Sequence, residues 1–211
     1  LTLRDGELHV ALVKRKARAA RGRWALPGGF LLEGESAEAA AYRELAEEVG
    51  LRRRDVRLEQ LASYTAPKRD TEHPKRVISI AYLALAADLP DTVPGTDADE
   101  AEWVPVEAAL GRRLAFDHAQ ILRDGIERAR SKLEYATIAT AFLPPEFTMS
   151  ELRGVYEAVW GVRLDPANFN RKVIGTDGFV VDTGEQRRGR GRPAAIYRVG
   201  DATRLNPPLT R

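Results

Sequence analysis

The chain has 211 residues, of which 44% are hydrophobic and 30% are charged, and it contains no cysteine. This composition excludes disulfides, thiol catalysis and thiolate zinc sites, and no apolar run approaches the ~18 residues of a membrane span. The net charge of +2 is too small to indicate nucleic-acid binding by itself. The length favours two domains, and a cytoplasmic protein is the simplest expectation, although a start at Leu1 leaves a removed leader open.

The first part of the chain has the pattern of an α/β unit. Apolar runs typical of strands predict four of them, at residues 8–13, 56–66, 77–85 and 102–105. Asp117 is expected to begin a helix that runs to about Leu133 with its apolar side chains on one side.

Between the first two strands lies a helix with a cluster of carboxylates. Ser36 is the expected N-cap, Glu38 places an acid in the first turn, and Gly50 is the expected stop. At about 100° per residue, three glutamates fall within about 100° of arc beside the apolar face, namely Glu44, Glu47 and Glu48. Three carboxylates this close repel one another unless cations intervene.

The chemistry of this cluster suits a hard divalent cation. Mg²⁺ takes oxygen ligands and bridges to phosphates of a substrate. Arg43 stands four residues before Glu47, where it can pair with that ligand and orient it. Glu35 and Gly29 belong to the loop before the helix, where backbone must approach a phosphate closely. A solvated acidic face is the alternative, and the complete spacing on both sides of the helix disfavours it.

The segment Gly29–Leu51 fits the pattern G-x5-E-x7-R-E-L-x-E-E-x-G-L without substitution. A match of this kind arises by chance roughly once in ~10⁹ windows, and it resembles the signature of the Nudix family. That resemblance implies an α/β/α sandwich with a mixed sheet. It also implies that Glu44, Glu47 and Glu48, supported by Arg43, hold Mg²⁺ or Mn²⁺ ions that promote attack of water on a pyrophosphate. The identity of the substrate does not follow from the motif.

After a connector that ends at residue 146, a second helical region has a clear beginning. Thr148 and Glu151 have the spacing of a capping box. The apolar residues around and after it recur at helical spacing and share one face, namely Phe147, Leu152, Val155, Tyr156, Val159 and Trp160. Gly161 is expected to end this helix.

A second helix is predicted to begin at Asp165 and to stop at Gly175. Phe169 and Val173 point to one side of it, whereas the polar residues Asn168, Arg171 and Lys172 share the other. Short strands at 179–181 and 195–197 then flank a basic tip, GEQRRGRGRP. Helix, turn, helix and basic hairpin, in this order, predict a winged helix-turn-helix and hence an α+β protein.

The chemistry of this module suits double-stranded DNA. Asparagine binds adenine edges, arginine reads guanine, and either cation neutralises phosphate. The tip carries arginines spaced by glycines, which suits a minor groove, namely Arg187, Arg188, Arg190 and Arg192. A solvated loop is the alternative for the tip, as solvation is for Asn168 and Arg171. The combination of polar helix face, buried partner helix and basic wing favours DNA.

A Nudix domain followed by a winged helix resembles the NrtR family, the Nudix-related transcriptional regulators of NAD metabolism. The resemblance covers nearly the whole chain, and its second anchor is the segment 147–175, especially Asn168–Lys172. Members of this family are homodimers that repress genes of NAD synthesis or related metabolism. They leave a palindromic operator when ADP-ribose or a related nucleotide binds the Nudix domain.

The resemblance implies a Nudix domain at residues 1–134 and a winged helix at 135–211. It places Asn168, Asn170, Arg171 and Lys172 on the recognition helix and the arginines of the tip on the wing. It places Gly29, Glu35 and the three glutamates at the effector pocket, with Arg69 and Arg76 as further phosphate contacts unless they lie on an exposed loop. Many members have a degraded Nudix motif, whereas this one is intact. An ADP-ribose pyrophosphatase therefore stays open, as does a module that binds RNA or protein.

Overall fold

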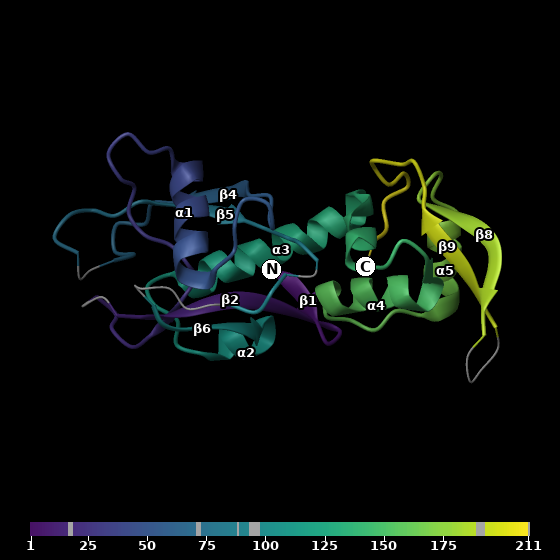
Figure 1. Ribbon diagram of the computed structural model, residues 1–211, viewed down its shortest axis with the longest axis horizontal. Coiled ribbons are helices and arrows are strands. Elements are labelled where there is room, and N and C mark those ends of the chain that lie inside the picture. Colours follow the sequence, from purple (N-terminus) through teal and green to yellow (C-terminus); the bar gives the residue numbers. More distant parts are fainter. Residues whose placement is uncertain (17–18, 71–72, 88, 93–97, 189–192, 211) are drawn as a thin grey trace. The chain divides into compact units, whose positions relative to one another are not determined.

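The computed structural model describes residues 1–16, 19–70, 73–87, 89–92, 98–188 and 193–210, with the backbone alone at 98–99. These residues divide into two compact units, one of residues 1–4 and 8–126, the other of residues 5–7 and 127–211. The boundary falls inside helix α3 (His118–Tyr135), which therefore contributes to both units (Figure 1). The expected functional division after residue 134 stays a prediction.

The main sheet of the first unit is built around a buried strand. Its strands are β1 (Thr2–Arg4), β2 (Glu7–Arg15), β3 (Trp24–Ala25) and β6 (Ala98–Pro105). β2 pairs antiparallel with β3 on one side and with β6 on the other. Residues 8–13 are all buried, which is typical of a strand covered on both faces. The strand predicted there is confirmed, whereas β6 begins earlier than the predicted 102–105.

The other strands of this unit are β4 (Glu59–Tyr64) and β5 (Ser79–Leu83), which pair antiparallel. Both are shorter than the runs at 56–66 and 77–85. Leu58 donates its N–H to the Tyr42 hydroxyl at 3.0 Å, and the Thr65 carbonyl accepts from the Arg76 side chain at 3.0 Å. Side chains therefore replace strand partners at both ends of β4.

The sheet also has a parallel element. The nitrogen of Leu1 donates to the carbonyl of Ala84 at 2.7 Å, and the N–H of Ala86 donates to the carbonyl of Leu1 at 3.2 Å. Leu1 thus bonds to the residues on either side of residue 85, and this hydrogen-bond pattern is typical of parallel strands. The mixed sheet expected from the sequence is therefore present.

Helices cover this sheet on both sides. α1 (Ala37–Val49) and α2 (Val106–Gly111) both pack against β6, as Figure 1 shows. The Ser36 hydroxyl accepts from the N–H of Ala39 at 3.1 Å, and Gly50 ends α1 with a φ of 78°. Both predicted caps of α1 are confirmed, and only a glycine adopts this left-handed conformation without strain. α2 was not predicted.

The second unit contains the 3₁₀ helix η1 (Thr137–Phe142), β7 (Phe147–Thr148), α4 (Met149–Trp160), α5 (Pro166–Ile174), β8 (Val180–Arg187) and β9 (Ala194–Val199). The predicted capping box at Thr148 and Glu151 is present, and Gly161 ends α4. Asp165 caps α5 by accepting from the N–H of Asn168 at 2.7 Å. All the apolar residues predicted to share the inner faces of α4 and α5 are buried.

The strands of this unit pair in the order β7–β9–β8. The predicted strand 179–181 was too short, because β8 continues to Arg187 through a register shift between Asp182 and Gln186. Gly184, with a φ of 78°, lies within that shift. Arg187 is therefore part of a strand, and the tip of the hairpin begins after it. β7 was not predicted.

The residues after β9 fold back onto the second unit. Leu205 and Leu209 are buried, and their N–H groups donate to the carbonyls of Tyr135 and Glu134, each at 3.0 Å. These bonds satisfy carbonyls at the end of α3, where the helix itself supplies no partner. Throughout the described ranges, no helix is both long and apolar enough to cross a membrane.

Candidate functional site

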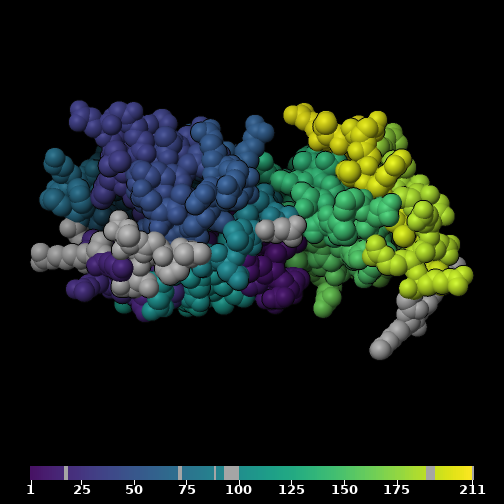
Figure 2. All heavy atoms as spheres, viewed as in Figure 1, coloured from purple at the N-terminus to yellow at the C-terminus, as the bar shows by residue number. Residues whose placement is uncertain are grey.

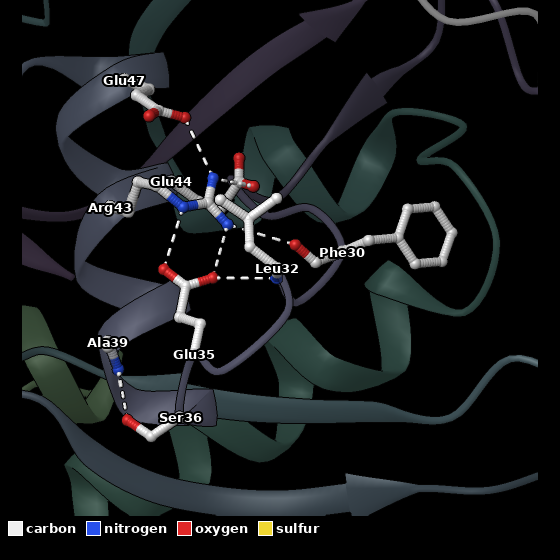
Figure 3. Close-up of polar contacts among 8 residues, drawn as sticks. All are labelled: Phe30, Leu32, Glu35, Ser36, Ala39, Arg43, Glu44 and Glu47. Atoms are coloured by element: carbon white, nitrogen blue, oxygen red, sulfur yellow. Dashed lines mark hydrogen bonds and ion pairs between the residues drawn. The ribbon is translucent and has the colours of Figure 1, made fainter.

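Three of the predicted carboxylates gather around the Arg43 guanidinium, namely Glu35, Glu44 and Glu47 (Figure 3). Arg43 binds both oxygens of Glu35, from Nε to Oε1 at 3.0 Å and from Nη2 to Oε2 at 2.9 Å. Its Nη1 donates to Oε1 of Glu44 at 2.6 Å and to Oε2 of Glu47 at 3.1 Å. The structure thus brings these four predicted residues together on α1 and the loop before it.

The loop before α1 is fixed to the same cluster through its backbone. Arg43 Nη2 donates to the Phe30 carbonyl at 3.1 Å, and the Leu32 N–H donates to Glu35 Oε2 at 3.1 Å. The Gly28 N–H donates to Oε2 of Glu48 at 2.8 Å. All the glutamates of the motif therefore bind either Arg43 or the backbone of this loop.

The backbone of Gly29 lies against the Glu44 carboxylate of this cluster. A Cβ added to this residue would overlap the carboxylate of Glu44. The absence of a Cβ leaves room here for the Glu44 carboxylate. Close approach of the Gly29 backbone to a phosphate stays a prediction.

Hydrogen bonds and charge stabilise the ionised forms at the centre of the cluster. The bidentate hydrogen bonds from Arg43, followed by the bond from the Leu32 N–H, lower the pKa of Glu35. The same bonds to Glu35, with those to Glu44, raise the pKa of Arg43. The guanidinium and the carboxylate of Glu35 are therefore both ionised at neutral pH.

The donor chemistry of the glutamates fits a divalent metal ion, since carboxylate oxygens are the ligands that Mg²⁺ prefers. Their present arrangement is closed by Arg43, and the residues that the structure describes contain no group of three His, Cys, Asp or Glu placed to hold a metal ion. The side chains of Glu44 and Glu47 are 15% and 48% exposed, so an ion can reach them from solvent. Metal ligation by Glu44, Glu47 and Glu48 stays a prediction.

Arg69 and Arg76 have quite different surroundings. The Arg69 side chain is 4% exposed and forms a bidentate pair with Asp117, at 2.9 Å from Nε and 2.6 Å from Nη2. Arg76 is exposed and donates to the backbone carbonyl of Thr65. Neither contacts the Arg43 cluster through these bonds, and their role in phosphate binding stays a prediction.

The outer face of α5 carries the predicted base-reading side chains. Asn168, Asn170 and Arg171 are exposed, while Phe169 and Val173 on the opposite face are buried. Arg171 Nη2 donates to Oδ1 of Asn168 at 2.7 Å, which leaves the amide nitrogen of Asn168 outside that bond. The amphipathic division expected from the sequence is therefore present.

Lys172 is half-buried at the edge of that face. Its Nζ donates to the carbonyl of Thr210 at 3.0 Å, in the segment after the wing. No sequence signal predicted this contact, because residues 200–210 have no periodic pattern.

The wing arginines do not share one environment. Arg187 pairs with Glu151 at 2.8 Å and donates to the Glu146 carbonyl at 3.2 Å. Arg188 is exposed. Arg190 and Arg192 lie outside the described residues. Glu151 and Asp117 are thus the acidic partners that sequence reasoning missed, since both had already been interpreted as helix caps.

Comparison of the sequence with protein families identifies both parts of the chain. Residues 1–125 match the NUDIX domain and residues 139–199 match the NrtR DNA-binding winged helix domain. The ADPR responsive transcriptional repressor NtrR of Acinetobacter baylyi is 33% identical over 196 residues, covering 92% of this chain and 76% of that protein.

Solved structures lead to the same family. The crystal structure of Shewanella oneidensis NrtR complexed with a 27mer DNA matches with a TM-score of 0.76 and 31% identity, covering 99% of this chain and 95% of that one. The NUDIX domain of that protein, complexed with ADP ribose, matches with a TM-score of 0.56 and 32% identity, over 61% of this chain and 82% of that one. The chain therefore belongs to the NrtR family, in which a Nudix domain precedes a DNA-binding winged helix.

Proposed function

We propose that this protein is a DNA-binding transcriptional repressor of NAD-metabolism genes whose Nudix domain senses ADP-ribose or a related nucleotide. Binding of that ligand releases the operator. The observation that carries the proposal is the exposed polar face of α5, because hydrolysis of a nucleotide requires no such module. The relatives that bind DNA and ADP-ribose support it.

Each side chain on the DNA-binding face has a distinct role in this proposal. Asn168, Asn170 and Arg171 enter the major groove, where amide and guanidinium groups discriminate base edges. Lys172 and Arg188 contact phosphates, and the basic tip with Arg190 and Arg192 follows the minor groove. Arg187 contributes through its position at the base of the wing.

The proposed repressor acts as a homodimer. Two-fold symmetry predicts a palindromic operator with half-sites separated by about one helical turn, ~34 Å, or a multiple of it. ADP-ribose then favours one arrangement of the dimer, and that arrangement misplaces the recognition helices. Access to chromosomal DNA places the proposed repressor in the cytoplasm.

The effector is held at the cluster around Arg43. Nudix hydrolases depend in general on divalent metal ions, and Glu44, Glu47 and Glu48 would hold Mg²⁺ or Mn²⁺ here. The ion would neutralise the charge of the diphosphate. Glu35 and Arg43 fix the loop that carries Gly29, so the backbone is ready to approach the phosphates.

An active ADP-ribose pyrophosphatase is the second candidate, which the intact motif favours. Incubation with ADP-ribose and Mg²⁺ or Mn²⁺ would release AMP and ribose 5-phosphate, and Glu47→Gln or Glu48→Gln would abolish the release. Both functions are compatible, since hydrolysis would remove the signal that the repressor senses. Absence of AMP with either ion removes this candidate.

A DNA-shift assay tests the main proposal. The protein is expected to retard upstream regions of NAD-synthesis genes at moderate salt, in the presence of excess nonspecific DNA, and ADP-ribose is expected to reverse the shift. Single-stranded RNA serves as a competitor, which distinguishes a module that binds RNA from one that binds DNA. Equal retardation of all DNA sequences, or preferential displacement by the RNA competitor, would reject the repressor.

A further inference from the structure

The loop before α1 exposes three consecutive apolar side chains. Phe30, Leu31 and Leu32 are 65%, 55% and 59% exposed. Single exposed apolar residues are ordinary, whereas adjacent exposed apolar residues are a candidate binding surface. This group lies next to the carboxylates, so it belongs to the neighbourhood of the proposed nucleotide site.

The exposed residues are held in place by their backbone. The Phe30 carbonyl accepts from Arg43, and the Leu32 N–H donates to Glu35. Figure 3 shows that the ring of Phe30 points away from the cluster while its carbonyl points toward it. A ligand that contacted both the carboxylate cluster and the Phe30 ring would therefore have a charged group at one end and an apolar ring at the other.

A second ring faces Phe30 from a distant part of the chain. The ring centroids of Phe30 and His73 are 5.5 Å apart, with planes inclined by 39°. His73 Nδ1 lies 2.9 Å from the Lys75 carbonyl oxygen and 3.2 Å from its nitrogen. The His73 N–H donates to Asp70 Oδ1 at 3.1 Å. The imidazole is thus oriented by its own segment.

That segment is anchored by a buried ion pair. The Arg69 N–H donates to the Ala66 carbonyl at 3.2 Å, and the Arg69 guanidinium holds Asp117. Arg69 therefore fixes the chain close before Asp70 and His73. Arg69, which the family resemblance predicted as a phosphate contact, would then act by positioning the segment that carries the His73 imidazole.

We propose that Phe30 and His73 form the base-binding end of the nucleotide site, while the carboxylate cluster serves the diphosphate end. The inference rests on the proposed function and adds the residues that recognise the base. The ligand class is an extended nucleoside diphosphate with a purine base. Stacking of a base on an aromatic side chain contributes about 1–3 kcal/mol by alanine substitution, which corresponds to a change in Kd of about 5- to 150-fold.

Calorimetric titration of the full chain in Mg²⁺ tests the inference with ADP-ribose, ADP, AMP and inorganic pyrophosphate. Phe30→Ala and His73→Ala should weaken each nucleotide by about 5-fold or more, yet leave pyrophosphate nearly unchanged. Phe30→Tyr keeps a ring and should bind as the wild type does. Tyr135→Ala removes an aromatic ring of comparable exposure (54%) outside this loop, so it is the matched control and should change little.

The outcomes separate the inference from the proposed function. If the wild type binds ADP-ribose and both alanine variants bind it equally well, the base-binding role is wrong. A parallel decrease in pyrophosphate binding also rejects it, because the loop would then only support the carboxylates. If ADP or AMP binds in a Phe30-dependent manner and ADP-ribose does not, the role stands and the proposed effector fails. If no nucleotide binds, both fail.

Light scattering on the same samples addresses a second copy of the chain as the occupant of this surface. A change in mass for Phe30→Ala, with unchanged nucleotide affinity, would reject the base-binding role in favour of a contact between protomers.

Discussion

Arg187 and Glu151 form an ion pair of 2.8 Å that ties strand β8 of the wing to the first turn of α4. The other oxygen of Glu151 accepts from the N–H of Thr148 at 2.6 Å and from its hydroxyl at 3.0 Å. Burial alone would raise the pKa of Glu151, but the bonds from Thr148 and the charge of Arg187 lower it. One carboxylate therefore caps a helix and fixes the base of the wing.

Substitutions at Glu151 separate these two roles. Glu151→Ala removes the capping box and should lower the free energy of unfolding by roughly 1 kcal/mol. Glu151→Gln should cost less, because an amide oxygen still accepts from the Thr148 N–H. Both variants remove the half-exposed ion pair with Arg187, which is worth about 1 kcal/mol at most. Urea denaturation measures the difference, and equal decreases in stability would contradict a capping role.

The DNA affinity of Arg187→Gln tests whether this residue positions the wing. A substitution that removes one phosphate contact reduces the slope of log K against log salt by about 1. Arg187→Gln should weaken binding with little change in slope, whereas Arg188→Gln, its exposed neighbour, should reduce the slope. A reduced slope for Arg187→Gln would assign it a direct phosphate contact.

His118 makes the stability of the first unit sensitive to pH. Burial lowers its pKa from 6.5 to about 4, against the opposing effect of Asp117, and Nδ1 accepts from the Leu26 N–H at 2.9 Å. Between these values the unfolded chain binds more protons than the folded one, so stability is full above pH 6.5 and is lost as the pH falls toward 4. Thermal melts of the wild type and His118→Gln should converge in this range. Parallel curves would contradict a neutral, buried imidazole.

Arg69 and Arg76 should respond differently to truncation. Arg69→Ala leaves Asp117 without its bidentate partner and should cost about 3 kcal/mol of stability. Arg76→Ala removes an exposed side chain and should stay within about 0.5 kcal/mol of the wild type. Chemical denaturation of the two variants in parallel measures this. Similar, small effects would show that the Arg69–Asp117 pair does not anchor its loop.

Substitution by alanine should have different effects at two glycines: it should impair ligand binding at Gly29 and raise stability at Gly154. Gly29→Ala forces the Glu44 carboxylate to move and should impair binding of Mn²⁺ and ADP-ribose. Gly154 lies inside α4 with nothing within 4 Å of an added Cβ, so Gly154→Ala should stabilise the protein by about 0.5–1 kcal/mol. Melting temperature and metal titration check the pair. Unchanged ligand binding by Gly29→Ala would show that the Glu44 carboxylate can shift without loss of binding, and the predicted effect would be wrong.

Local spacing was enough to predict the helices that carry the site. Ser36 is the N-cap and Gly50 the C-cap of α1, and Thr148 and Glu151 form the capping box of α4. These could be predicted because each capping residue lies within a few residues of the helix end that it caps. Amphipathic spacing likewise predicted the buried and exposed faces of α5.

Partners far apart in the sequence could not be predicted in this way. Asp117 lies 48 residues from Arg69, and Glu151 lies 36 residues from Arg187, so no periodic pattern links them. β7 has only two residues and exists because β9 pairs with it. The segment that holds Lys172 is fixed by bonds to the end of α3 rather than by its own pattern.

The coupling between nucleotide and DNA is tested most directly by fluorescence anisotropy of a labelled palindromic operator during titration with ADP-ribose, with AMP assayed in the same samples. Linkage requires that ADP-ribose weaken operator binding by the same factor by which the operator weakens ADP-ribose binding. We expect a fall in anisotropy, with reciprocal factors of about 5–150. Operator binding that is unchanged at saturating ADP-ribose would contradict the account.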